Sequence, residues 1–193
     1  MGRGSRRALL AALLAVCASP LAAPTDDALL AKLRSGGHVL LVRHSATAQG
    51  LGDPPGLRIE DCATQRNLSE EGREQAKRLG EFLRKERIPI ARVYSSPWCR
   101  CRDTATIAFG SAEDWAPLSS FFDLPHRELE YSESVQRRIA SYAVKKPPGN
   151  VVMVTHNVNI AALTKLSVAP GEVVVVRPDG CCHLKVVGRL NIE

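Results

Sequence analysis

Two apolar runs in this sequence end in a histidine, the first in Arg43 and His44 and the second in His156. A third apolar run leads into a Ser-Ser-Pro turn, and Arg100 stands three residues after the proline. Two guanidinium groups can hold a tetrahedral phosphoryl group through paired hydrogen bonds, and arginine stays charged at any relevant pH. An imidazole held at a strand end can attack phosphorus and carry the phosphoryl group covalently. These residue types predict phosphoryl transfer, with His44 as nucleophile and Arg43, Arg100 and His156 around the phosphoryl oxygens.

The elements that must position these side chains are short strands, because apolar runs bounded by turn residues are typical of buried strands. In open α/β sheets, ligands bind beyond the carboxyl ends of the strands. Helix, strand and helix alternate along the chain, as in a doubly wound sheet. The fold class expected is therefore α/β: a three-layer sandwich with a mainly parallel central sheet flanked by helices.

One helix is marked by its apolar spacing, since Ser69 can cap a segment in which small and apolar residues recur every three to four positions. Its core-facing residues are Ala76, Leu79, Gly80 and Leu83. The other elements expected are helices over 25–33, 132–144 and 157–166, and strands over 92–95, 116–119, 172–176 and 183–187. The segments 49–66 and 121–131 are expected to wall the pocket. The sequence has no large inserted cap domain, so we expect an open site for broad or small substrates.

The ordered blocks resemble the histidine phosphatase superfamily, also called the phosphoglycerate-mutase-like or histidine acid phosphatase clan. That family has strand-Arg-His, then Ser-Ser-Pro-x-x-Arg with Thr-Ala further on, then strand-Thr-His. All three blocks occur here in that order, with Asn67-Leu68-Ser69-Glu70-Glu71-Gly72 between the first two. The resemblance covers roughly residues 37–166. It implies a phosphohistidine intermediate on His44 and a reaction that needs no metal and no organic cofactor.

Further candidates lie within or next to these blocks. Arg100, rather than Arg102, matches the family arginine, and Ser45 stands where the family usually has glycine beside the phosphate. We count Ser45, Arg66 and Asn67 as substrate-binding candidates. Arg66 either binds an acidic substrate or lies on the surface. Asn67 either reaches the phosphate or caps the following helix, and the cap is the favoured interpretation.

The leaving oxygen needs a proton, and many family members take it from an acidic residue in the loop after the strand that follows the arginine helix. With a strand over 116–119, the candidates are Asp123, Glu128 and Glu130. We select Asp123, which follows two phenylalanines, although no family motif surrounds any of the three. Some small relatives that resemble bacterial phosphohistidine phosphatases lack this acid.

Residues 1–23 have a basic start, an apolar core over 8–16 and small residues after it, the layout of a bacterial-type secretory signal that is too short for a membrane span. A single domain is then expected over 24–193, exported to the periplasm or secreted. The export route stays open between a general and a twin-arginine signal, and Cys17 loosely resembles a lipoprotein anchor. Removal of the segment lowers the net charge from +6 to +3, because it holds three arginines and no acidic residue. The charge therefore indicates no nucleic-acid partner.

Five cysteines remain after that segment, namely Cys62, Cys99, Cys101, Cys181 and Cys182. In an exported protein they are first of all disulfide material. A bond from Cys62 to Cys99 or Cys101 would tie the loop after the first strand to the arginine helix. A zinc site is disfavoured, because neither the Cys-x-Cys nor the Cys-Cys pair has the usual separation of zinc ligands.

The function expected is a metal-independent phosphatase that hydrolyses small phosphomonoesters through His44. The alternatives kept open are a phosphohistidine protein phosphatase and a non-catalytic phosphate-binding module of the same fold. A mutase fits export poorly, since its sugar-phosphate substrates are cytoplasmic. A metal-dependent hydrolase is disfavoured, because no carboxylate accompanies either histidine at ligand spacing. The sequence leaves the natural substrate and the oligomeric state open.

Overall fold

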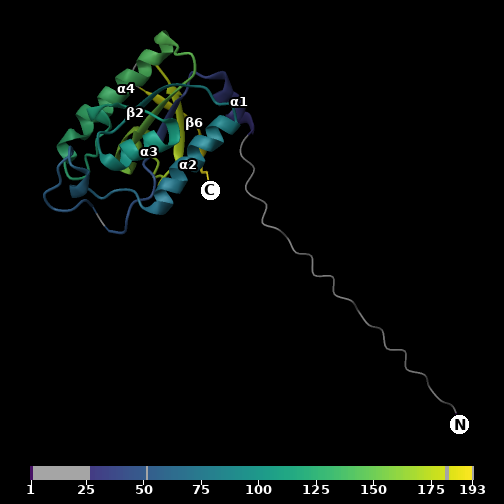
Figure 1. Ribbon diagram of the computed structural model, residues 1–193. Coiled ribbons are helices and arrows are strands. Elements are labelled where there is room, and N and C mark those ends of the chain that lie inside the picture. Colours follow the sequence, from purple (N-terminus) through teal and green to yellow (C-terminus); the bar gives the residue numbers. More distant parts are fainter. Residues whose placement is uncertain (2–26, 51, 181–182, 193) are drawn as a thin grey trace.

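The computed structural model describes residues 1, 27–50, 52–180 and 183–192 (Figure 1). The expected signal segment 1–23 with Cys17, and the cysteines Cys181 and Cys182, lie outside the described residues. The helices are α1 (Asp27–Ser35), α2 (Glu70–Lys85), α3 (Cys99–Phe109), α4 (Glu128–Lys145) and α5 (Asn157–Thr164), with short 3-10 turns η1 (Cys62–Thr64), η2 (Ala116–Leu118) and η3 (Pro125–Arg127). The strands are β1 (Val39–Arg43), β2 (Ile90–Ser95), β3 (Glu113–Asp114), β4 (Asn150–Thr155), β5 (Val173–Pro178) and β6 (Leu184–Leu190).

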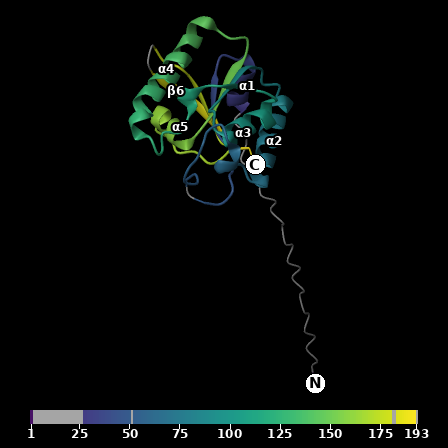
Figure 2. The same ribbon diagram turned by 60° about the vertical axis from the view of Figure 1, so that its left-hand side comes forward.

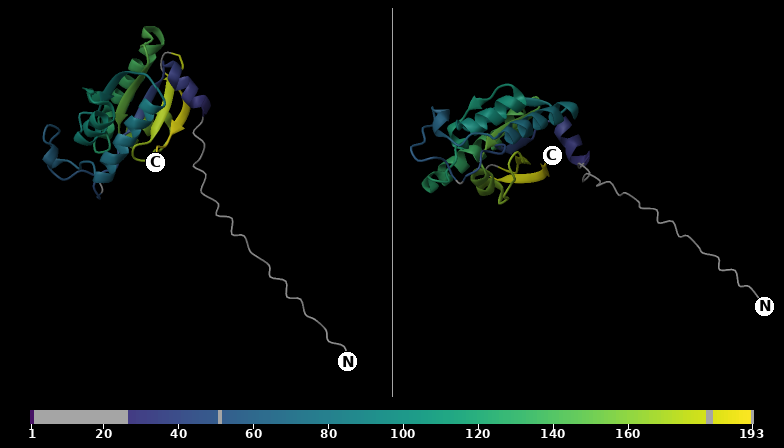
Figure 3. Two further views of the ribbon diagram at one scale, coloured as in Figure 1. Left: turned by 45° about the vertical axis from the view of Figure 1, so that its right-hand side comes forward. Right: turned by 60° about the horizontal axis from the view of Figure 1, so that its bottom comes forward.

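Within the described chain the strands form one six-stranded sheet in the order β3-β2-β4-β1-β5-β6. Strands β1, β2, β3 and β4 run parallel to one another, and β5 and β6 are antiparallel to their neighbours. Helices α1, α2 and α3 lie on one side of the sheet and α4 and α5 on the other (Figures 2 and 3). The expected three-layer α/β fold with a mainly parallel sheet is confirmed.

The core is divided into two layers, because successive residues of a strand point to opposite faces of the sheet. On β1, Leu40 and Val42 pack toward α1, α2 and α3, whereas Val39 and Leu41 pack toward α4 and α5. Strands β4 and β5 alternate in the same way, and both faces of each are buried. Near-continuous apolar runs are typical of strands that are covered on both faces.

Helix α2 begins as expected, with the Ser69 side chain accepting a hydrogen bond from the Gly72 amide at 3.1 Å. Gly72 lies against the chain that follows His44, and a Cβ at this position would stand 1.9 Å from the carbonyl oxygen of Ala46. Only glycine permits this approach of helix and loop. The helix thereby fixes the segment that leaves the carboxyl end of β1.

Two elements differ from the sequence prediction. Residues 116–119 were expected to form a strand, but 116–118 form a 3-10 turn and the strand is the short β3 before it. Pro117 explains the difference, since proline has no amide hydrogen to donate to a sheet. Helix α4 begins at Glu128, one turn before the expected start, so Glu128 and Glu130 belong to its first turn. Within the described residues, no helix is both long enough and apolar enough to cross a membrane.

Candidate active site

The two histidines meet because β1 and β4 are adjacent parallel strands, paired with Arg43 opposite Thr155. The chain continues from this pair into His44 and His156, whose ring centroids are 5.3 Å apart. The His44 amide donates to the Thr155 carbonyl at 2.9 Å, which extends the strand pairing by one residue. Both histidines and Arg100 are at most 5% exposed.

The ring of His44 is oriented by its own backbone neighbour, since Nδ1 lies 2.8 Å from the Ser45 carbonyl oxygen. A carbonyl can only accept, so Nδ1 carries the proton and Nε2 keeps its lone pair. Burial lowers the pKa of His44 to about 3, against the effect of this hydrogen bond, and the charges of Arg100 and Arg43 add to the lowering. The imidazole is therefore neutral at neutral pH, with Nε2 in the state that a nucleophile requires.

His156 contacts three polar side chains. Its Nε2 lies 3.0 Å from the Ser96 hydroxyl and 3.5 Å from the Cys101 sulfur, and its Nδ1 lies 3.4 Å from Nη2 of Arg100. Burial, followed by the neighbouring His44 and Arg100, lowers the pKa of His156 well below its ordinary value. When the Ser96 hydroxyl donates to Nε2, the single proton of the neutral ring stands on Nδ1. Nδ1 and Nη2 of Arg100 can then donate together to one anionic oxygen.

Three guanidinium groups line the same pocket, those of Arg43, Arg66 and Arg100. Two of them are anchored to backbone carbonyls: Arg43 donates to Val168 at 2.5 Å, and Arg66 donates to Gly50. The Nε atoms of all three arginines are buried and have no partner in the described part of the chain. Buried donors are rarely left unpaired, so an anion that accepts from them would relieve a substantial cost.

The pocket has a volume of about 300 Å³. Its lining comprises Arg43, His44, Gly52, Asp53, Arg66, Arg100, Ser120, Phe122, Asp123, His156, Asn157 and Val158. The structure thus brings together Arg43, His44, Arg100, His156, Arg66 and Asp123 from the sequence-predicted set. The pocket walls include residues from both segments that the sequence predicted to form them, 49–66 and 121–131.

Two of the predicted substrate-binding residues do not line this pocket. Ser45 is buried behind the nucleophile, with its amide donating to the Thr104 hydroxyl at 3.0 Å. Asn67 donates to the Cys62 carbonyl at 2.7 Å. The favoured interpretation of Asn67 as the helix cap was wrong, because Ser69 accepts the capping hydrogen bond two residues later.

The three candidate acids are placed differently. Asp123 is exposed at the mouth of the pocket, where Phe121 is buried and Phe122 is 68% exposed. Glu130 pairs with Arg127 at the surface, 2.7 Å away, and neither it nor Glu128 lines the pocket.

Asp53 is a charged residue of the pocket that sequence reasoning did not select. Its Oδ1 lies 2.7 Å from Nη1 of Arg100, and both side chains are almost fully buried. The Gly-Asp-Pro sequence around it is typical of a turn, and a turn carries no signal that distinguishes a pocket carboxylate from an exposed one. Arg102, by contrast, faces outward as expected and forms an exposed ion pair with Asp114.

The pocket loop is fastened to α3 by a disulfide between Cys62 and Cys99, one of the two pairings that the sequence suggested. The side-chain oxygen of Gln65 adds a hydrogen bond from the Cys99 amide at 2.9 Å. Cys101 is free and buried, and burial raises the pKa of its thiol to about 12, so the thiol is inert. No group of three or more histidine, cysteine or acidic side chains among the described residues could hold a metal ion.

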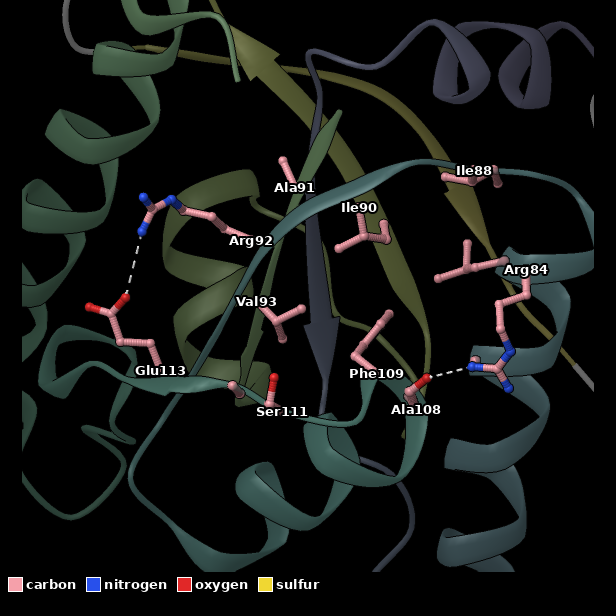
Figure 4. Close-up of a pocket in the computed structure, with 13 residues that line it drawn as sticks. Arg84, Ile88, Ile90, Ala91, Arg92, Val93, Ala108, Phe109, Ser111 and Glu113 are labelled. Atoms are coloured by element: carbon pink, nitrogen blue, oxygen red, sulfur yellow. Dashed lines mark hydrogen bonds and ion pairs between the residues drawn. The ribbon is translucent and has the colours of Figure 1, made fainter. Parts of the chain in front are cut away.

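A larger cavity, about 590 Å³, lies between α2, α3 and β2, away from this site (Figure 4). Apolar side chains such as Ile88, Val93 and Phe109 line this cavity, and its charged residues have partners of their own. Arg84 donates to the Ala108 carbonyl, and Arg92 faces Glu113. The larger cavity has no nucleophile beside a group of anion-binding side chains among its lining residues. We therefore take the smaller pocket, which has both, as the active site.

Fold and pocket together define an α/β protein with a histidine nucleophile in an arginine-lined anion site. Residues 39–124 match the family described as the histidine phosphatase superfamily (branch 1). The matched segment holds Arg43, His44 and Arg100, and over these residues the chain is similar to that superfamily. No curated protein matches it.

Solved structures share the fold at low sequence identity. The protein histidine phosphatase SixA complexed with tungstate is 17% identical with a TM-score of 0.61, over 80% of this chain and 96% of that one. A mycobacterial glucosyl-3-phosphoglycerate phosphatase complexed with VO3 is 18% identical with a TM-score of 0.56, over 81% and 99%. A phosphoserine phosphatase mutant from Entamoeba histolytica, bound to phosphoserine, is 15% identical with a TM-score of 0.53, over 81% and 98%. At these identities the likeness extends to the fold alone.

Proposed function

We propose that this protein is a metal-independent phosphatase that hydrolyses small phosphomonoesters through a phosphohistidine on His44. One observation carries the proposal. A neutral imidazole with a free Nε2 lines a pocket together with three arginines whose buried Nε groups have no partner among the described residues. The match of residues 39–124 to the histidine phosphatase superfamily supports a phosphorylated substrate.

The reaction would proceed in two displacements. Nε2 of His44 attacks phosphorus, the bond from phosphorus to the leaving oxygen breaks, and that oxygen takes up a proton. Water then attacks the phosphohistidine, the bond from phosphorus to nitrogen breaks, and phosphate leaves as His44 is restored. Arg43 and Arg100, with Nδ1 of His156, stabilise the charge on the equatorial oxygens in both steps.

Asp123 is our candidate for the proton donor to the leaving oxygen. It stands at the mouth of the pocket, where the leaving group of a phosphate held by the arginines would point outward. Arg66 lines the same pocket and would contact the phosphoryl group or an acidic substituent of the substrate.

We further propose that the protein works outside the cytoplasm as a single domain over residues 24–193, after removal of residues 1–23. The disulfide between Cys62 and Cys99 supports this location, because such bonds persist mainly in oxidising compartments.

The proposal is tested by phosphate release from an aryl phosphate between pH 4 and 9, with EDTA present, by the wild type and His44→Ala. We expect hydrolysis that resists EDTA and disappears in the variant. Loss of activity with EDTA would instead indicate a metal hydrolase, and activity in His44→Ala would exclude this nucleophile. A folded protein that binds phosphate without hydrolysing any phosphomonoester or phosphohistidine would be a binding module.

A panel of small phosphomonoesters and a phosphohistidine peptide separates the two phosphatase functions. The exposed mouth around Phe122 and Asp123 supports broad use of small substrates. A preference for the peptide of more than about tenfold in kcat/KM would favour the protein phosphatase instead.

A further inference from the structure

The guanidinium of Arg100 is held from several sides although the pocket beside it is open. Its Nη1 donates to Oδ1 of Asp53 at 2.7 Å, and its Cζ lies 4.5 Å from the centre of the Trp98 ring. Nη2 makes only a long contact, 3.4 Å, with Nδ1 of His156. Nε has no partner among the described residues.

The position of Asp53 on this group decides which donors remain free. In arginine, Nε–H and one hydrogen of Nη2 project from the same edge of the plane, whereas Nη1 lies at the opposite end. Asp53 occupies Nη1 and leaves the Nε and Nη2 edge unused. Such an edge is what binds two oxygens of a phosphoryl group at once.

Asp53 is itself held in place. The same Oδ1 accepts from the Arg66 amide at 3.0 Å, and the carboxylate is only 8% exposed. Its loop is joined to α3 by the disulfide from Cys62 to Cys99, the residue immediately before Arg100. The disulfide therefore ties the loop that carries Asp53 to the helix that carries Arg100.

We propose that Asp53 is a positioning residue, which orients Arg100 so that the Nε and Nη2 edge faces the phosphoryl group. The inference rests on the proposed phosphatase function, since it assigns Asp53 a part in that site. Asp53 also lines the pocket, but its carboxylate accepts from Nη1 of Arg100 and acts on the phosphoryl group through that guanidinium. An aspartate that merely filled an empty anion site would compete for the edge that the phosphate uses.

Asp53→Asn tests the proposal with little change in shape, because the amide oxygen can still accept from Arg100 and Arg66. The matched control is Asp114→Asn, which removes a carboxylate from Arg102 on the same helix but outside the pocket. Loss of the charge-assisted bond in Asp53→Asn should raise both KM for an aryl phosphate and Ki for inorganic phosphate about tenfold. The control should change neither.

These two constants do not depend on the fraction of protein that is folded, so they separate positioning from a structural role. A lower kcat with unchanged KM and Ki would overturn the proposal. A lower Ki would overturn it as well and would identify Asp53 as a competing anion.

Calorimetric titration of inorganic phosphate into His44→Ala, with and without Asp53→Asn, tests the proposal without turnover. Weaker binding in the double variant supports the positioning role even if the wild type hydrolyses nothing, in which case only the proposed function fails. Equal or tighter binding in the double variant contradicts the positioning role.

Discussion

Burial of a neutral His44 should make the fold sensitive to acid in a measurable way. In the native protein its pKa is about 3, whereas an unfolded histidine titrates near its ordinary value of 6.5. Below pH 6.5 the unfolded chain therefore binds the proton first, and acid shifts the equilibrium toward unfolding. The contribution of His44 to stability is complete above pH 6.5 and is lost as the pH falls toward 3.

The size of the effect follows from that pKa difference. Each unit of pH in this window changes the free energy of unfolding by about 1.4 kcal/mol for one such group. Between pH 7.5 and 4.5 the loss due to His44 alone is therefore about 3 kcal/mol. A loss of this size is a large part of the stability of an ordinary domain.

Urea unfolding of the wild type and of His44→Asn, at half-unit steps from pH 7.5 to 4.5, isolates this term. Asparagine can keep the hydrogen bond to the Ser45 carbonyl but does not titrate. The other groups cancel between the two proteins except His156, whose pKa is lowered by burial first and by His44 second. The wild type should lose about 3 kcal/mol more than the variant over this range. Saturating phosphate should reduce the difference, because a bound anion favours the imidazolium. If the free energies of unfolding of the two proteins changed with pH in the same way without phosphate, the assignment of His44 as a buried neutral imidazole would be refuted.

Three further predictions concern the frame of the site. Cys62→Ser should lower the free energy of unfolding by about 4 kcal/mol, because the bond to Cys99 closes a loop with a sequence separation of 37. Urea unfolding of the variant and of oxidised wild type measures the difference, and reduced wild type, which also lacks the bond, should resemble the variant. Gly72→Ala should lower the free energy of unfolding by at least about 2 kcal/mol and should lower kcat/KM, because the added Cβ would overlap the Ala46 carbonyl two residues after the nucleophile. Calorimetry measures the stability and the aryl phosphate assay measures kcat/KM. Unchanged values of both would contradict the prediction. Asn150→Ala should cost about 3 kcal/mol in chemical unfolding, because this fully buried side chain makes three backbone hydrogen bonds. It donates to the carbonyls of Leu33 in α1 and Pro89 before β2, and it accepts from the amide of His38 before β1.

Local errors in the sequence prediction have local physical causes. Asn67 and Ser69 are both good caps, and the choice between them depends on where the backbone first turns helical. The family resemblance led us to expect a strand over residues 116–119, but Pro117 cannot supply the amide that a strand needs.

The sequence by itself determined the elements and the order of the site. The apolar runs that end in Arg43, His44 and His156 predict the buried strands β1 and β4. Apolar residues at every third or fourth position after a serine cap predict α2. Both signals can be seen in the sequence because burial periodicity and capping act over only a few residues. The motif order was enough to indicate phosphoryl chemistry.

The tertiary structure alone decided which side chains surround that chemistry. It placed β1 beside β4, chose Cys99 rather than Cys101 for the disulfide and brought Asp53 to Arg100 across 47 residues. These contacts join residues far apart in the sequence through irregular loops, whose conformation no local sequence pattern predicts. Which residues meet therefore depends on how the whole chain packs. The partner of an arginine in such a pocket can therefore be known only from the folded molecule.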